Sequence, residues 1–112
     1  MNITYANSKV ERYFTDYSKM MKKIPLEWVR TIKKIMSQLI AADNFGIYLS
    51  LGLGKPEQLV GYKNITYSLH VTANIRLIIE LNASQDTIKI CDEIKVKGVS
   101  DYHGKKDNWY IS

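Results

Sequence analysis

Cysteine and proline are scarce in this chain of 112 residues, which has one Cys and two Pro. The lone Cys91 cannot form a disulfide within the chain, and no Cys/His group has the spacing of a metal site. The sequence therefore predicts a protein without a structural metal, in a reducing compartment such as the cytoplasm.

Long apolar runs and linker sequences are also missing. Residues 1–7 are polar and lack the apolar stretch of a signal peptide, and no later run approaches the roughly 20 apolar residues that cross a membrane. There is no internal repeat, low-complexity tract or Pro/Ser-rich linker. We expect a single domain over residues 1–112, with no membrane partner.

The composition is that of a folded protein with a basic surplus. Hydrophobic residues make up 46% and charged residues 24%, close to globular averages. Lys and Arg number 16 against 11 Asp and Glu, a formal charge of +5. This surplus favours a polyanion such as nucleic acid as partner, although proteins that bind acidic proteins share it.

The first part of the chain predicts a strand and two helices. Residues 2–6 form a short opening strand, and the stretch 8–11, Ser-Lys-Val-Glu, matches a capping box at a helix start. Apolar residues at helical spacing predict one buried face on the first helix: Val10, Tyr13, Phe14, Tyr17, Met20 and Met21. Pro25 suits the first turn of a second helix, which runs to about Ala42. Its buried stripe consists of Val29, Ile32, Ile35, Met36 and Leu39.

After Ala42 the pattern predicts a loop and then strands. Four glycines and Pro56 between residues 43 and 63 predict a loop with short extended pieces. Alternating apolar residues and polar turns predict three successive strands, at 65–71, 75–81 and 87–96. The whole chain thus predicts an α+β fold, with an N-terminal strand and a two-helix hairpin packed on an antiparallel sheet.

Arg76 is the first candidate for chemistry. The odd positions of strand 75–81 are apolar, so Arg76 and Glu80 should point away from the helices. A guanidinium on a rigid strand can hold a phosphate with two hydrogen bonds and stabilise its charge in a transition state. The alternative is a surface arginine paired with Glu80 or Glu93.

The second candidate is the stretch 100–106, which reads Ser-Asp-Tyr-His-Gly-Lys-Lys. Histidine moves protons near neutral pH, a tyrosine hydroxyl donates or accepts, and an aspartate can orient the imidazole. These are the parts of a metal-free phosphodiesterase, although a polar tail without chemistry also fits the stretch.

In their order along the chain these segments resemble the RelE/ParE superfamily of bacterial toxins, and in particular its HigB-like killer proteins. The resemblance covers nearly the whole chain and is carried by residues 67–69, 74–78 and 101–103. It implies a RelE-like fold and the toxin of a type II toxin–antitoxin pair. It further implies an endoribonuclease (mRNA interferase) that cleaves messenger RNA on the ribosome without metal or cofactor. In such enzymes the ribose 2′-hydroxyl attacks the adjacent phosphate.

The resemblance implies a role for each candidate residue. Arg76 would stabilise the phosphate, while Asp101, Tyr102 and His103 would do the acid–base and orienting work. Lysines near the site in sequence would bind RNA phosphates: Lys55, Lys63, Lys95, Lys97, Lys105 and Lys106.

Two residues of strand 65–71 are open to a second reading. Tyr67 stands where some HigB-like toxins have a histidine, which would make it a further catalytic residue. Strand alternation, however, puts Tyr67 on the same side as Leu69, as a core aromatic. His70 belongs to the opposite face, where it is either part of the site or an ordinary surface histidine.

The resemblance also implies partners and two rivals. The partners are messenger RNA, the ribosome and a HigA-like antitoxin with which the chain forms an oligomer. One rival is a ParE-like inhibitor that poisons DNA gyrase by protein contact, and the other is a non-catalytic RNA-binding module. Trp109 and Tyr110 either stack on a base or pack against the domain or an antitoxin.

Overall fold

A computed structural model describes residues 1–103 and 106–112, without the side chains of residues 102, 103, 106 and 107. The helices in the described part are α1 (Ser8–Thr15), α2 (Tyr17–Met21), α3 (Leu26–Ala41), α4 (Phe45–Ser50) and the 3-10 helix η1 (Gln85–Ile90). The strands are β1 (Asn2–Tyr5), β2 (Glu57–Leu59), β3 (Ile65–His70), β4 (Ile75–Leu81), β5 (Glu93–His103) and β6 (Lys106–Ile111). None of these helices combines the length and the apolar character needed to span a bilayer.

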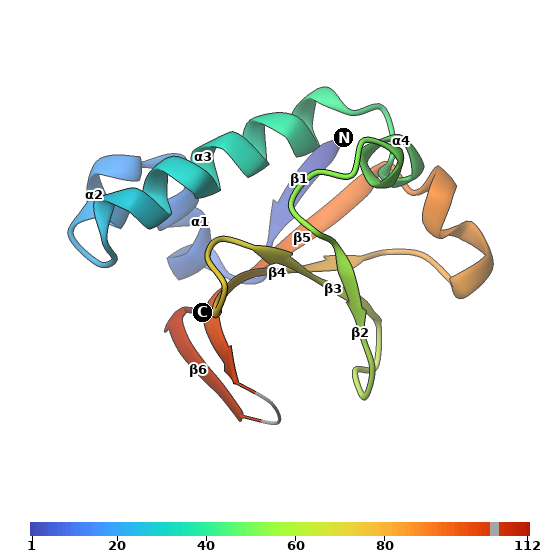
Figure 1. Ribbon diagram of the computed structural model, residues 1–112. Helices are drawn as coiled ribbons and strands as arrows, with labels where there is room; N and C mark the ends of the chain where they lie inside the picture. Colours follow the sequence, from blue (N-terminus) through green and yellow to red (C-terminus); the bar gives the residue numbers. More distant parts are fainter. Residues whose placement is uncertain (104–105) are drawn as a thin grey trace.

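The strands form one mixed sheet, covered by helices on one face (Figure 1). The order is β1-β5-β4-β3-β2, and β6 pairs with the far end of β5. β1 runs parallel to β5, and every other pairing is antiparallel. The sheet curves so that the face away from the helices is concave and open (Figure 1). This architecture confirms the expected α+β fold, with a sheet more extensive than the sequence predicted.

The helical layer confirms the predicted stripes with three corrections. All five members of the second stripe are buried on α3. The first helix is interrupted at Asp16, whose carboxylate accepts from the Ser18 amide and so starts α2. The N-cap of α1 is Asn7, whose Oδ1 accepts from the Val10 amide at 2.9 Å, so the predicted start at a Ser8 capping box is wrong by one residue. Met21, expected in the core, is 46% exposed.

The segment 43–63, predicted as a loop, contains the helix α4. Asn44 caps it by accepting from the Ile47 amide at 2.9 Å. Gly46, which favoured a loop in the sequence, instead permits close packing: a Cβ there would lie 2.5 Å from the Lys89 carbonyl oxygen of η1. Glycine at this position allows α4 and η1 to pack closely and does not interrupt the helix.

The predicted strand 87–96 is also wrong over its first half. Residues 85–90 form η1, and Ser84 and Thr87 make a capping box at its start. Local hydrogen bonds of this kind compete with a strand ladder. β5 begins at Glu93 and runs on to His103, so the segment predicted as a tail forms the β5–β6 hairpin. Ile88 is buried, whereas Ile90 is 73% exposed.

Candidate active site

Four residues lie in a row across the open face of the sheet, one on each of the strands β3 to β6. His70 pairs with Arg76, Arg76 with Ser100, and Ser100 with Trp109. Directly opposite residues share a face of the sheet, with their Cβ atoms about 5 Å apart. The row is therefore a cluster of an imidazole, a guanidinium, a hydroxyl and an indole, built on rigid strands.

The Arg76 guanidinium is fixed by the β3–β4 turn. Its Nη1 donates to the carbonyl oxygens of Thr72 at 2.9 Å and Ala73 at 2.6 Å. Its Nε is buried and has no acceptor among the described residues. A guanidinium fixed in this way on a rigid strand can hold an anion such as phosphate. The surface ion pair considered as the alternative is not formed, because Glu80 pairs with Lys95 and Lys97, each at 3.7 Å.

His70 has an environment that disfavours its charged form. Partial burial lowers the pKa of its imidazole below 6.5, and the positive charges of Arg76 and Lys55 lower it further, while Glu57 acts in the opposite direction. A histidine with a lowered pKa is neutral at neutral pH and can accept a proton. The site thus pairs a fixed cation with a neutral base.

The loop before β2 brings Lys55 to His70. Lys55 has a positive φ of 44°, and the Gly54 carbonyl oxygen accepts from the His70 amide at 2.8 Å. Gly54 has a φ of +68°, and a Cβ on it would lie 2.6 Å from the Tyr48 hydroxyl oxygen. Only glycine suits this position, so the approach of the loop to His70 depends on it.

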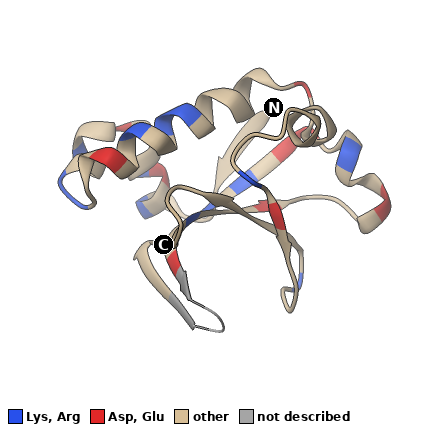
Figure 2. Cartoon of the chain, viewed as in Figure 1, with Lys and Arg blue, Asp and Glu red and all other residues tan. Residues whose placement is uncertain are grey.

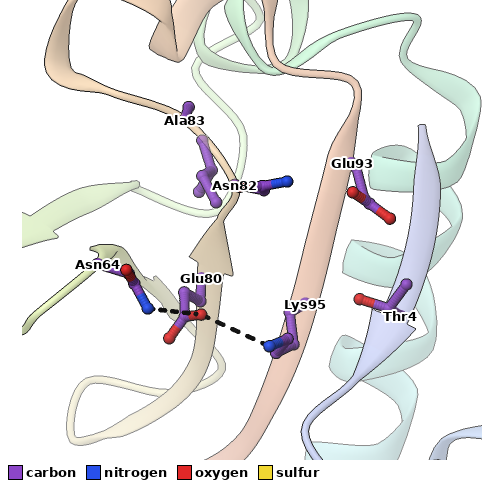
Figure 3. Close-up of a pocket in the computed structure, with 8 residues that line it drawn as sticks. Thr4, Asn64, Glu80, Asn82, Ala83, Glu93 and Lys95 are labelled. Atoms are coloured by element: carbon purple, nitrogen blue, oxygen red, sulfur yellow. Dashed lines mark hydrogen bonds and ion pairs between the residues drawn. The ribbon is translucent and has the colours of Figure 1, made fainter.

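Trp109, at the end of the row, borders a groove that continues along the open face. One hollow of ≈ 310 Å³ is lined by Trp109, Ile78, Thr66 and residues of the β2–β3 loop, and it shares Asn64 and Glu80 with a second hollow of ≈ 500 Å³. Figure 3 shows the second hollow, with Thr4 and Glu93 at one side, Asn64 and Glu80 at the other, and Lys95 between them. The groove has room for an extended polar chain beside the row.

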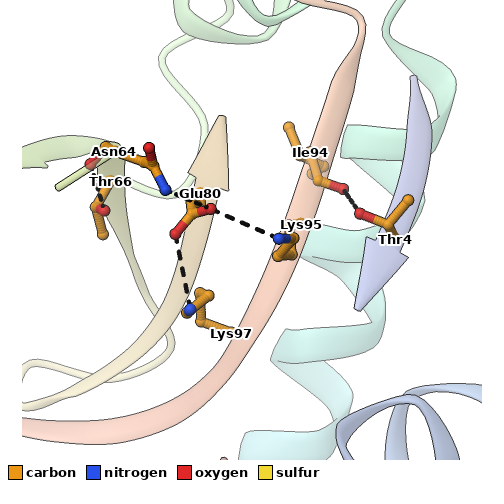
Figure 4. A network of polar contacts seen from close by, with 7 residues as sticks. All are labelled: Thr4, Asn64, Thr66, Glu80, Ile94, Lys95 and Lys97. Atoms are coloured by element: carbon orange, nitrogen blue, oxygen red, sulfur yellow. Dashed lines mark hydrogen bonds and ion pairs between the residues drawn. The ribbon is translucent and has the colours of Figure 1, made fainter. Parts of the chain in front are cut away.

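Glu80 is the centre of the polar contacts in this groove (Figure 4). It accepts from Asn64 Nδ2 at 3.2 Å and pairs with the ammonium groups of Lys95 and Lys97. Two of the lysines predicted to bind RNA are therefore on the open face, with their charge partly balanced by Glu80. Lys63 lines the same groove.

The predicted acid–base residues continue β5 beyond the row. Asp101 pairs with Ile75, whose side chain is in the core, so alternation gives Asp101 the face opposite to Arg76. The backbones of Tyr102 and His103 pair with Asp107 and Lys106. The side chains of Tyr102, His103 and Lys106, and the whole of Lys105, lie outside the described residues.

Tyr67 lies on the helix-covered face and is 8% exposed. Its ring packs edge-on against Phe45 at 4.9 Å between centroids, and its hydroxyl donates to Gln58 Oε1 at 3.4 Å. Burial raises the pKa of its hydroxyl. The structure therefore places Tyr67 in the core, across the sheet from Arg76.

The C-terminal aromatics divide between the two faces. Trp109 is on the open face, at the end of the row, and is 39% exposed. Tyr110 packs edge-on against Trp28 of α3 at 5.1 Å between centroids. The predicted packing against the domain thus applies to Tyr110, whereas Trp109 stands beside the groove.

Sequence reasoning left His70 undecided and missed Glu57. Strand alternation was a usable signal for His70, since it placed the residue opposite to Leu69. Nothing local marked Glu57, because its position depends on the pairing of β2 with β3, which sets Glu57 opposite Ser68. Within the part of the chain that is described, no three His, Cys, Asp or Glu side chains come close enough together to hold a metal ion.

The fold is shared with two solved structures. The chain is similar to a chain of the YoeB-YefM complex from Staphylococcus aureus, with 21% identity and a TM-score of 0.56, over 92% of this chain and 97% of the other. It is also similar to the YoeB/ParE toxin from Agrobacterium tumefaciens, with 18% identity and a TM-score of 0.56, over 92% of this chain and all of the other. No protein-family model and no curated protein matches the sequence. At this level of identity the likeness establishes a shared fold, and it confirms the RelE-like architecture expected from the sequence.

Proposed function

We propose that this chain is the toxin of a type II toxin–antitoxin pair and that it cleaves messenger RNA. The observation that carries the proposal is the pairing of a neutral His70 with a turn-anchored Arg76 on the open face of the sheet. The two structures of the same fold are described as YoeB and YoeB/ParE toxins, and one of them was solved with YefM. A candidate base and a fixed guanidinium side by side favour RNA cleavage over inhibition by contact alone.

The chemistry follows from the two side chains. His70 accepts the proton of a ribose 2′-hydroxyl, whose oxygen attacks the adjacent phosphorus. The bond from phosphorus to the 5′-oxygen of the next nucleotide breaks, which leaves a 2′,3′-cyclic phosphate and a 5′-hydroxyl. Arg76 binds the phosphate oxygens with its guanidinium, which the β3–β4 turn holds in place, and stabilises the extra charge of the transition state.

The leaving 5′-oxygen needs a proton, and the end of β5 is our proposed source. The backbone of β5 passes Arg76 at Ser100 and reaches Tyr102 and His103 two and three residues later. We assign the acid to Tyr102 or His103, as the resemblance to HigB-like toxins implies. Asp101, to which the resemblance gives an orienting role, lies on the face opposite to Arg76, so we leave it out of the proposed site. Lys55, Lys63, Lys95, Lys97, Lys105 and Lys106 would bind the RNA phosphates on either side.

The proposed partners are messenger RNA on the ribosome and an antitoxin of the HigA kind. The antitoxin would cover the open face, because a protein bound there would block the row and the groove together. The HigB-like subtype and the dependence on the ribosome rest on the resemblance of residues 67–69, 74–78 and 101–103.

The test is inducible expression with mapping of RNA 5′ ends, with and without ribosomes. We expect growth arrest and new 5′-hydroxyl ends, both abolished in Arg76→Ala and His70→Ala. General base and phosphate-stabilising groups are each worth about 10²–10³-fold in rate. Lys89→Ala, an exposed change on η1, is the control and should remain toxic.

Two results would count against cleavage. Full toxicity in both site variants would exclude His70 and Arg76 as the catalytic pair. Intact RNA together with stalled replication would favour a ParE-like inhibitor that acts on DNA gyrase by contact. Folding of each variant is checked by circular dichroism, since Arg76 also ties the β3–β4 turn.

A further inference from the structure

The positive charge of the molecule is concentrated away from the proposed active face. Residues 8–42, which form α1 to α3, hold eight Lys and Arg against three Asp and Glu, a net charge of +5. The whole chain also has a net charge of +5, so the rest of it balances at eight of each sign. Figure 2 shows the cations along α1 to α3, on the layer that covers the other side of the sheet. The catalytic row therefore does not account for the basic surplus.

Four of these cations surround a hollow between α1 and α2. The hollow measures ≈ 430 Å³, and its lining consists of Lys9, Arg12, Tyr13, Lys19 and Lys22. Lys9, Arg12 and Tyr13 stand at helical spacing on one side of α1, and Lys19 and Lys22 come from α2 and its C-cap. Two short helices joined at Asp16 thus direct their cations to one place.

The cations of the hollow are not neutralised by neighbouring acids. Both ion pairs formed by the described residues involve Glu80, on the other side of the sheet. Glu11 is on the opposite side of α1 from Lys9, and its charge acts on Tyr5. Asp16 acts on Lys19, but its carboxylate is engaged by the amide and the hydroxyl of Ser18. A hollow with four cations and one partly engaged acid attracts anions.

We propose that this hollow binds phosphate groups of an RNA backbone, at a site separate from the catalytic row. All four cations are exposed, which suits an extended chain of phosphates better than a small ligand enclosed in a pocket. The α1–α2 segment exposes one large apolar side chain, Met21, and so offers an acidic peptide little to anchor it. Tyr13 adds a hydroxyl that can donate to a phosphate oxygen.

The site gives the molecule two nucleic-acid surfaces on opposite sides of the sheet. One segment of RNA would lie on the helical layer, while the scissile strand lies on the concave face. This inference does not depend on the proposed cleavage, because it concerns binding alone. The inference predicts that RNA binding at α1 and α2 has the same affinity in Arg76→Ala as in the unaltered chain.

The test is fluorescence anisotropy with a labelled duplex of 2′-O-methyl RNA, which cannot undergo 2′-hydroxyl attack. The variant Arg12→Gln/Lys19→Gln should bind at least about tenfold more weakly than the unaltered chain. The slope of log K against log salt should fall by about 1.5, as expected for two lost phosphate contacts. The matched control is Arg30→Gln/Lys34→Gln, which removes two exposed charges from α3 outside the hollow and should change affinity less than threefold.

Two outcomes would overturn the site. Equal losses of RNA affinity in the two double variants would mean that binding depends only on the net charge of the protein. A polyglutamate peptide that binds the hollow, while the RNA duplex does not, would identify an acidic protein as its partner. Thermal unfolding of both variants excludes a general loss of structure, and unchanged binding by Arg76→Ala separates this result from the fate of the proposed cleavage.

Discussion

His70 and Arg76 are directly opposite each other in the β3–β4 ladder, and the turn that joins their strands also binds the arginine. The turn therefore fixes the position of the charge that acts on His70. The turn carbonyls hold the guanidinium in place, and the guanidinium charge disfavours a proton on the imidazole. The predictions below follow from this pair and from the packing behind it.

The pKa of His70 should respond to its three charged neighbours in opposite directions. Arg76→Ala and Lys55→Ala each remove a positive charge and should raise it, whereas Glu57→Gln should lower it further. The measurement is an NMR titration of the imidazole. The chain has two histidines, so His70→Gln assigns the resonance. A pKa that does not change in Arg76→Ala would show that the pair is not coupled.

The same histidine should make stability depend on pH. Its folded pKa is below 6.5, so the unfolded chain binds the proton more tightly. The free energy of unfolding contributed by His70 is then complete above pH 6.5 and is lost as the pH falls from 6.5 through the folded pKa. Urea unfolding across this pH range should show a falling free energy of unfolding. In His70→Gln, the part of this fall that is due to His70 should be absent. The opposite sign would contradict the lowered pKa.

Ser100 offers a test of a buried hydroxyl beside Arg76. Its side chain is fully buried and its Oγ has no hydrogen-bond partner in the described structure. Ser100→Ala removes this unpaired group and should leave stability unchanged or raise it by about 1 kcal/mol. Ser68→Ala is the matched control, with the same burial and the same unpaired Oγ. A loss of RNA cleavage in Ser100→Ala alone would indicate that this buried hydroxyl helps to position Arg76.

Tyr67 should matter for packing and not for chemistry. Tyr67→Phe removes a hydroxyl with one long hydrogen bond to Gln58, so stability should change by less than about 1 kcal/mol. Cleavage should be retained, because the ring lies across the sheet from Arg76. Tyr67→Ala opens a cavity against Phe45 and should cost about 3–5 kcal/mol. Loss of cleavage in a Tyr67→Phe variant that remains stable would show that the Tyr67 hydroxyl takes part in catalysis.

The loop beside His70 can be tested through its glycines. Gly52 and Gly54 both have a positive φ, but only Gly54 would place a Cβ against the Tyr48 hydroxyl. Gly52→Ala should cost about 1 kcal/mol and Gly54→Ala about 3 kcal/mol. Adding Tyr48→Phe should recover the steric part of the Gly54→Ala loss, because the Tyr48 hydroxyl is buried without a partner. Equal costs at the two glycines, measured by urea unfolding, would exclude the steric contact.

Periodicity predicted the parts of the fold that depend on neighbours in sequence. The α3 stripe and the alternation of β4 were both confirmed, and with them the placement of Arg76 away from the helices. The errors occurred where local polar chemistry competes with periodicity. Ser84 and Thr87 form a capping box where Ile88 and Ile90 suggested a strand, and Asn44 starts a helix in a glycine-rich segment.

The candidate site was predictable only in part, because its members come from separate strands. Arg76 was visible from alternation on one strand. The contribution of His70 required the β3–β4 register, and that of Lys55 and Glu57 required the path of the preceding loop. Long-range pairing of this kind has no local signature in the chain.

The parallel pairing of β1 with β5 determines when the first strand can join the sheet during synthesis. β1 is bound along Glu93–Val96, about ninety residues later in the chain, so it has no partner until most of the chain has been synthesised. At roughly 5–20 residues per second, a new chain passes several seconds with its first strand unpaired. The strand that carries Ser100 also lies within this last segment, and the row beside Arg76 is completed in the same step. A nascent chain released early would therefore lack both the partner of its first strand and the residue opposite Arg76.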